Sequence, residues 1–231
     1  MFQASGRKVL GGVLAATLLL GSGGCSSSRS NAKVDESWMA RVPTSDMEDV
    51  RQAQVVVNTA EENLTRAKVA HQDSKEELKV AKEREKITNQ QQKVAQKALE
   101  LGNTTDRSQD VTRAQNELQQ AEENMTAARA ETEWKEKAVT TRESMVKMRE
   151  REVDVAKAQL NQARYRTLER NGDARAEKLD SGKVNDEVAK ARAEATKEQD
   201  RVNMNVKLER QAEARWKQAD TKARSYGGSG R

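Results

Sequence analysis

The sequence predicts an all-α fold: a long antiparallel coiled-coil hairpin with a third helix packed along it, in one elongated domain. Charged residues make up 34% of the chain and aromatic residues only 3%, a composition typical of long helices rather than of a compact core. The single proline is Pro43, so no proline interrupts a helix after it. Apolar residues then recur every seven positions, which is the spacing of a coiled-coil seam.

The first helix is expected to begin near Ser45, because Ser45 and Glu48 have the spacing of a capping box, and to end at Gly102. Two interleaved series with seven-residue spacing mark its buried face. They are Val50, Val57, Leu64, His71 and Leu78, and Ala53, Ala60, Ala67, Ser74 and Ala81. Beyond them the seam is expected to drift to a shifted series: Val80, Ile87, Val94 and Leu101.

A turn is predicted at 102–105, and Asp106–Gln109 resembles a capping box that starts the second helix. This helix has the most regular pattern of the chain. One series is Val111, Leu118, Met125, Thr132, Val139, Val146, Val153 and Leu160, and the other is Ala114, Ala121, Ala128, Lys135, Arg142, Arg149, Ala156 and Ala163. The helix is expected to end at 171–173, which makes it a rod of about 90 Å at 1.5 Å per residue.

The third helix is expected after Ser181-Gly182, with a short helical turn before it. Its contact positions, at spacings of three and four, are Val184, Val188, Ala191, Ala195, Val202, Ala212, Trp216, Ala219 and Ala223. The helical domain is thus predicted over 44–225, followed by a glycine-rich, disordered tail at 226–231. Because the connections are short, consecutive helices should be antiparallel neighbours.

The N-terminus has the order of an export signal: basic Arg7 and Lys8, an apolar stretch at 9–20, small residues, and then Cys25. The apolar stretch is shorter than the roughly 20 residues that cross a bilayer. The segment resembles the lipobox of bacterial lipoproteins, although Ser22 stands where that family has an aliphatic residue. The resemblance implies a signal peptide at 1–24 and lipidation of the Cys25 thiol by diacylglycerol, with a palmitate-type amide-linked acyl chain. An ordinary secretory signal is the alternative.

The same resemblance implies a location in the cell envelope. Ser26, rather than an aspartate, after the lipidated cysteine implies sorting to the outer membrane, with the protein facing the periplasm. A serine-rich, flexible tether is predicted over 25–43. Cys25 is the only cysteine, so the chain cannot form an internal disulfide.

The composition argues against several classes of function. Without Arg7 and Lys8 the chain keeps 40 of its 42 basic residues against 37 acidic ones, with the two signs interspersed. This pattern is typical of a solvated helical surface, so no nucleic-acid partner is expected. The sequence holds no phosphate-binding loop, nucleophile motif or metal-ligand spacing, so we expect no enzyme, no cofactor and no metal site. His71 lies alone in a seam, where a polar residue sets register.

Three cations and two tryptophans admit two interpretations each. Lys135, Arg142 and Arg149 follow one another in the seam of the second helix. Their long stems could extend out of a narrow seam, or they could form a basic stripe that binds an acidic protein, a lipid headgroup or a glycan. Trp134 and Trp216 could anchor a protein interface or cover the seam between helices.

The region of the first turn resembles the helix–turn–helix of TolC-type outer-membrane efflux channels. The likeness covers 101–106, Asp110-Val111, 114–118 and 120–122, and it implies a coiled hairpin tip without that family's transmembrane strands. The expected function is therefore that of a lipid-anchored envelope spacer or scaffold subunit, whose partners are the membrane and envelope proteins that dock by helix packing. The alternative is an accessory of an efflux or secretion complex that docks on a helical periplasmic channel. Alanine-rich seams bury little area per turn, so self-association is also expected.

Overall fold

The computed structural model of the protein describes residues 32–104 and 107–227. Three long helices dominate these residues, and all of their secondary structure is helical. The elements follow in the order η1 (Glu36–Arg41), η2 (Thr44–Met47), α1 (Glu48–Gly102), α2 (Ser108–Arg170), η3 (Ala176–Lys178) and α3 (Ser181–Gly227). The predicted all-α hairpin with a third packed helix is confirmed.

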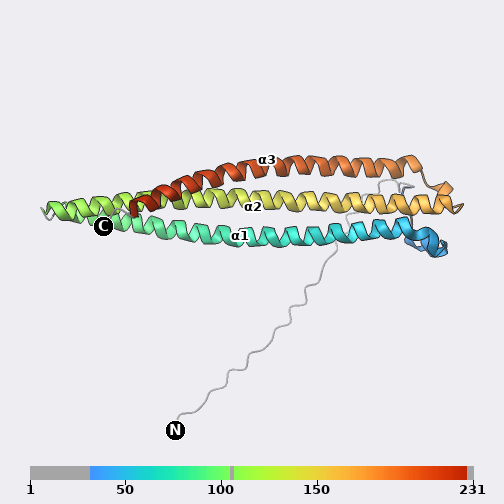
Figure 1. Cartoon of the computed structure of the whole chain (residues 1–231), viewed down its shortest axis with the longest axis horizontal. Coiled ribbons are helices and arrows are strands. Elements are labelled where there is room, and N and C mark those ends of the chain that lie inside the picture. The colour runs from blue at the N-terminus through green and yellow to red at the C-terminus, as the bar shows by residue number, and fades with distance from the viewer. Residues whose placement is uncertain (1–31, 105–106, 228–231) are drawn as a thin grey trace, which may run out of the picture. The chain divides into compact units, whose positions relative to one another are not determined.

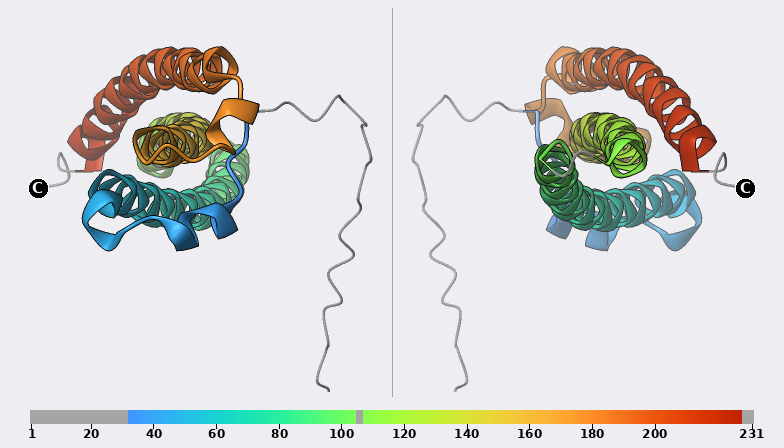
Figure 2. Two further views of the ribbon diagram at one scale, coloured as in Figure 1. Left: turned by 90° about the vertical axis from the view of Figure 1, so that its right-hand side faces the viewer. Right: turned by 90° about the vertical axis from the view of Figure 1, so that its left-hand side faces the viewer.

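The central element is α2, because both other helices pack along it (Figures 1 and 2). Short connections make α1 antiparallel to α2 and α2 antiparallel to α3. In the described part of the chain, α1 and α3 make almost no contact with each other. The three helices therefore form an open arrangement around α2 rather than a closed triangular bundle.

The seam between α1 and α2 follows the predicted heptads, whose two core positions are called a and d here. In α1, Val50 and Ala53 begin the a and d series, and in α2 Val111 and Ala114 begin them. Every residue of the two series predicted for 50–81 and of the two predicted for α2 is buried or half-buried. The seven-residue contact spacing is compatible with a coiled coil.

The predicted drift of the seam beyond Leu78 is wrong. The shifted series is exposed: Val80 by 54%, Ile87 by 54%, Val94 by 67% and Leu101 by 68%. The original register continues instead through half-buried Glu85, Thr88, Gln92, Ala95, Leu99 and Gly102. The reason is that α2 keeps its own unbroken heptads, so α1 must stay in phase with them even where its seam positions are polar.

A second contact face on α2 was not predicted from the sequence. It uses heptad positions c and g, about 100° around the helix from the a/d face. Its buried or half-buried members include Ala127, Trp134, Ala138, Thr141, Met145 and Met148. The contact positions predicted for α3 pack on this face, and all nine of them are buried or half-buried.

The two ends of the α2–α3 connection lie where the sequence places them. Gly172 has a φ of 63°. Its N–H donates to the Glu169 carbonyl at 3.0 Å, and the Asp173 N–H donates to the Leu168 carbonyl at 3.1 Å, which closes α2 with a Schellman motif. Asp180 then accepts a bond from the backbone N–H of Lys183 at 3.2 Å and caps the first turn of α3.

The capping box predicted at Ser45 does not form. The Ser45 hydroxyl donates to the Asp46 carboxylate at 3.0 Å, and 44–47 make the 3₁₀ turn η2 instead. As a result α1 begins at Glu48, with Met47 as an N-cap that offers no side-chain bond. The start of α2 also lacks a side-chain cap from Arg107, and Asp106 lies outside the described residues.

The segment predicted as a tether at 25–43 is packed in its described part. Ala32 and Val34 are buried at 0% and 2% exposure, and Met39 joins the same core. Asn161 of α2 fixes the segment, because its amide donates to the Ala32 carbonyl at 2.7 Å and its oxygen accepts the Val34 N–H at 2.9 Å. The serine-rich composition predicted a flexible tether, but buried apolar side chains and the Asn161 amide hold the described part of the segment against α2.

The predicted tail begins later than 226. Tyr226 still belongs to α3, and its hydroxyl accepts a bond from the Gln119 amide at 3.1 Å. Residues 228–231 lie outside the described residues.

Candidate functional site

The most distinctive feature of the helical unit is a two-helix tip, formed by the ends of α1 and α2 beyond the end of α3 (Figure 1). The bond from Gln119 to Tyr226 places the end of α3 beside the fourth turn of α2. About three turns of α2 therefore extend past α3. At the tip the two helices approach closely, since Gly102 lies against the backbone of Asp110 and Val111.

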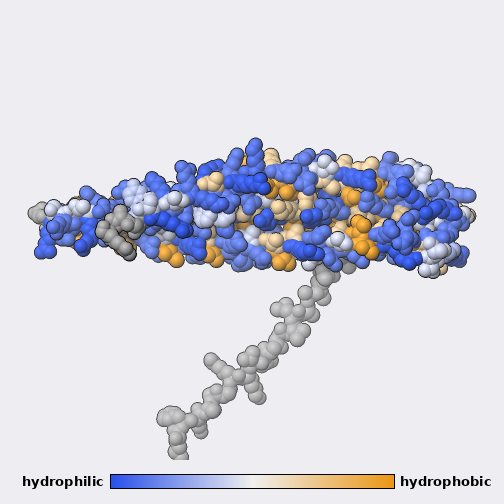
Figure 3. All heavy atoms as spheres, viewed as in Figure 1, coloured by the Kyte–Doolittle hydropathy of each residue, from blue (hydrophilic) through white to orange (hydrophobic). Residues whose placement is uncertain are grey.

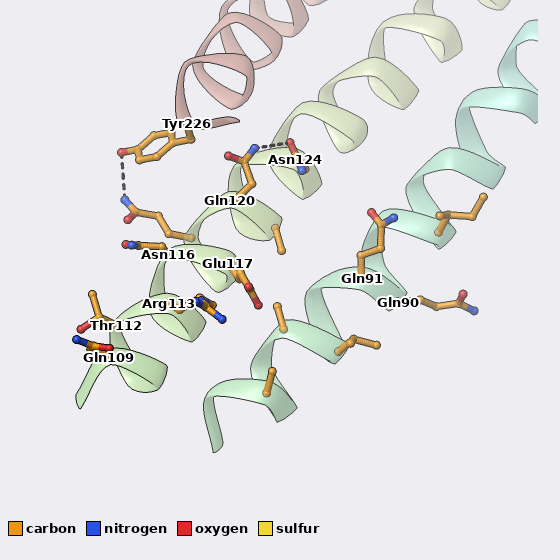
Figure 4. Close-up of a pocket in the computed structure, with 16 residues that line it drawn as sticks. Gln90, Gln91, Gln109, Thr112, Arg113, Asn116, Glu117, Gln120, Asn124 and Tyr226 are labelled. Atoms are coloured by element: carbon orange, nitrogen blue, oxygen red, sulfur yellow. Dashed lines mark hydrogen bonds between the residues drawn. The ribbon is translucent and has the colours of Figure 1, made fainter. Parts of the chain in front are cut away.

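A groove of about 1140 Å³ runs along the tip between α1 and α2 (Figure 4). On α1 its lining includes Ile87, Gln91, Val94 and Ala98. On α2 the lining is polar and rich in amides, with Gln109, Asn116 and Gln120 among its members. The α1 side of the groove thus combines apolar residues with two glutamines, the α2 side is mostly polar, and the groove lies open to solvent.

Two of the groove's apolar residues, Ile87 and Val94, belong to a longer exposed row on α1. The exposed row is defined as Val80, Ile87, Val94 and Leu101. These residues occupy successive c positions, so a single stripe with seven-residue spacing runs along the distal half of α1. Figure 3 shows hydrophobic residues at intervals along the edge of the molecule that α1 forms. Large exposed apolar residues in a regular row are typical of an interaction surface, whereas scattered ones are not.

The end of α3 coincides with a chemical change on α2. Deep in the bundle the c and g positions of α2 that receive α3 include Ala127, Trp134 and Ala138. Toward the tip the same positions become Arg113, Glu117, Gln120 and Asn124. A third helix would bury little apolar area there, so α3 gains nothing by continuing along α2.

Ion pairs between α1 and α2 stop short of the tip. Across most of the hairpin they recur, as Arg170–Asp49, Lys157–Glu61, Lys135–Glu77, Lys82–Glu136 and Arg84–Glu131, with N–O distances of 2.7 to 3.0 Å. In the described parts of the tip, 87–104 and 107–122, no ion pair occurs. The tip is therefore held by its seam residues without ion pairs, and it presents amides, charged residues and part of an apolar row to solvent.

The three seam cations of α2 each contact a side chain of the same hairpin. Lys135 is 17% exposed, lies 2.7 Å from Glu77 and places its ammonium 4.1 Å from the ring centre of Trp134. Arg149 lies 2.5 Å from Glu152. Arg142 contacts the sulfur of Met145 at 3.5 Å. These contacts favour the interpretation that long cationic stems extend from a narrow seam.

His71 lies in the α1 seam as predicted, half-buried, with an Nε2 that has no hydrogen-bond partner. The pKa of nearby Glu143 is lowered, first by its bond with Lys147 and to a smaller extent by His71. In the described residues, no group of three or more His, Cys, Asp or Glu side chains is arranged to hold a metal ion.

Arg175 joins two segments at the base of the bundle, defined as the end at which α1 begins and α2 connects to α3. Its guanidinium bonds the carboxylate of Asp173, donates to the Trp38 carbonyl at 3.3 Å and lies 5.4 Å from the Trp38 ring centre. The hydrogen bonds from the side chain and backbone of Arg175 hold the pKa of Asp173 far below its ordinary value of 3.8. Arg175 therefore fastens η1 to the α2–α3 connection.

Sequence reasoning identified the seams and the turn at Gly102 but missed the exposed row as a surface. The signal was present, because the row is a third series with seven-residue spacing, and a helix can turn only its a and d series toward one partner helix. Cys25, the predicted lipidation site, lies outside the described residues.

Within 32–104 and 107–227, no helix combines the length and the apolar character needed to span a membrane. The chain matches none of the protein-family models, none of the curated proteins and none of the solved structures with which it was compared.

Proposed function

We propose that the protein is a lipid-anchored coiled-coil spacer or scaffold of the bacterial cell envelope. The observation that carries the proposal is the docked segment, defined as residues 32–43, which follows Cys25 closely in the sequence. Only six residues separate Cys25 from Ala32, which is fully buried and bonded to Asn161. An extended chain of that length reaches no farther than about 25 Å.

A short link of this kind would couple a membrane anchor mechanically to the helices. The docked segment leads through η1 and η2 directly into α1, and Arg175 and Asn161 bond it to α2 and to the α2–α3 connection. The position of an acylated Cys25 would therefore fix the base of the bundle near the bilayer. The 55 residues of α1 then extend about 80 Å from that base.

The packing of the long helices supports a mechanical role. Inter-helix ion pairs recur along α1 and α2, and the heptad seams are continuous over the length of the hairpin. Stable anchoring needs more than one acyl chain, and a diacylglycerol with an amide-linked acyl chain on Cys25 would supply three. An anchored end and a chemically distinct tip are what a scaffold subunit requires.

The test is metabolic acyl labelling with membrane fractionation of the full-length protein, compared with the Cys25→Ser variant. We expect label and membrane retention in the parent and the loss of both in the variant. A matched control, Ser27→Ala, alters the same segment without removing the thiol and should behave as the parent. An unlabelled parent in the soluble fraction would overturn the proposal in favour of an ordinary secreted protein.

A second candidate is an accessory of an efflux or secretion complex, because the two-helix tip offers a groove to a helical partner. Crosslinking in cells from a residue of the tip would decide it. Capture of a transporter or channel would support this function. Loss of envelope spacing on deletion of the gene, with transport unchanged, would contradict it.

A further inference from the structure

We infer that the exposed row of α1 pairs with the same row of a second copy, in an antiparallel arrangement that places the two tips side by side. The inference goes beyond anchoring and does not depend on it, because it uses only the helical unit. The row is a regular heptad stripe of four large apolar residues, 54 to 68% exposed, on a helix whose a/d face is already occupied by α2. It is therefore a second seam that no helix among the described residues packs against.

The spacing of the row is self-complementary. If a two-fold axis passes between Gln90 and Gln91, Val80 lies opposite Leu101 of the second copy, and Ile87 lies opposite Val94. Two copies therefore match four apolar pairs with no offset. A closed two-fold contact of this type uses the same patch on both subunits and ends the assembly at a dimer.

The flanking residues agree with the same axis. On one side of the row, Glu83 comes opposite Lys97 of the second copy, and Gln90 meets its own counterpart. On the other side, Arg84 comes opposite Ala98, and Gln91 meets its counterpart. Opposite charges thus face each other twice and like charges not at all, which favours this register.

A parallel pairing would place different residues across from each other. The two flanks of the row would then face one another, so Glu83 would come opposite Arg84 of the second copy and Lys97 opposite Ala98. Arg84 already pairs with Glu131 of its own chain at 3.0 Å, whereas Lys97 makes no ion pair among the described residues. The antiparallel pair is therefore favoured, because it alone gives Lys97 an acidic partner.

The paired arrangement leaves room for the rest of the bundle. Ile87 and Val94 line the groove between α1 and α2, which is open to solvent, and α3 makes almost no contact with α1. From Glu48 to the proposed axis each α1 runs about 65 Å, so the two α1 N-termini would lie about 130 Å apart. The dimer would thus be a double-length rod with the N-terminus of one α1 near each end.

The first experiment is charge reversal in the full-length protein, extracted in mild detergent and measured by sedimentation at low ionic strength. The parent should be dimeric, and Glu83→Lys or Lys97→Glu alone should weaken the dimer about tenfold or more. The double variant Glu83→Lys/Lys97→Glu should recover the parent affinity, because it restores both ion pairs. Ile87→Glu should abolish the dimer, and Val69→Glu, on the same helix but outside the row, should not.

The second experiment fixes direction by disulfide trapping with Val80→Cys and Leu101→Cys in separate chains, using the parent with Cys25 as the control. Mixed chains should form the 80–101 disulfide, and neither chain alone should crosslink at its new cysteine. An 80–80 disulfide would show a parallel pair and overturn the inference. A monomeric parent, or a different protein crosslinked at the row in place of the second copy, would overturn it equally.

Discussion

The indole rings of Trp134 on α2 and Trp216 on α3 stack with their centres 4.6 Å apart and an angle of 17° between their planes. The ammonium of Lys135 lies 4.1 Å from the centre of the Trp134 ring. Trp134 therefore contacts both a cation and the ring of Trp216. The pair therefore covers the seam between α2 and α3, which was one of the two roles the sequence left open. It also explains how an alanine-rich third helix is held to α2.

Replacement of Trp216 by alanine should loosen α3 from α2. Loss of a large, half-buried ring and of the stack should lower the free energy of unfolding by about 2–3 kcal/mol. Urea denaturation followed by circular dichroism at 222 nm measures this. Trp216→Phe is the matched control, because it retains a ring for stacking and should lose less than half as much. Equal midpoints for the parent and Trp216→Ala would show that the stack contributes nothing to stability.

Replacement of Asn161 by alanine should release the docked segment. The Val34 N–H and the Ala32 carbonyl would lose their partner while buried, which costs about 1–3 kcal/mol. Amide hydrogen exchange over 32–42 should then accelerate, while exchange in the centre of α2 stays slow. The neighbouring variant Gln162→Ala removes an amide that bonds Asn185 of α3 at 2.7 Å and not the docked segment, so it should leave the segment protected. Unchanged exchange in the Asn161 variant would mean that apolar packing alone holds the segment.

Replacement of Gly172 by alanine should destabilise the end of α2. Its φ of 63° is unfavourable for a residue with a side chain, even though no atom lies within 4 Å of the added methyl group. The cost should be about 1 kcal/mol in the free energy of unfolding. Gly172→Asn should cost clearly less, because asparagine tolerates this conformation. Two variants of equal stability would contradict the backbone argument.

The Asp173–Arg175 pair should make stability depend on pH in the acid range. Because its pKa is depressed in the folded protein, Asp173 contributes stability that is present above its ordinary pKa of 3.8 and is lost as pH falls below it. Asp173→Asn should therefore be less stable than the parent at pH 6, and the difference should shrink toward pH 2. Urea midpoints for both proteins at the two pH values measure this. A difference that stays constant with pH would exclude an ionic contribution from Asp173.

Much of the fold follows from spacing alone. The heptads of α2, those of α1 up to Ala81 and the contact positions of α3 are all buried or half-buried as predicted, because a helix can bury only one stripe against one partner. The end of α2 at 171–173 also followed, since Gly172 permits a left-handed residue there.

The errors have a common physical origin, because local pattern does not reveal which partner a residue meets. Val80, Ile87, Val94 and Leu101 have seam spacing, yet the unbroken register of α2 keeps Leu99 and Gly102 in the seam instead. The docked segment depends on Asn161, more than a hundred residues away in sequence. The capping box at Ser45 lost to a competing bond with Asp46, a choice between polar partners that spacing cannot settle.

The most direct test of the anchored scaffold is the mass of the N-terminal peptide of the protein isolated from its own membrane. We predict that the first residue is Cys25 and that it carries the added mass of a diacylglycerol and one fatty acyl chain. A chain that begins at another residue, or at Cys25 with an unmodified thiol and amine, would contradict the membrane anchor and with it the proposed function.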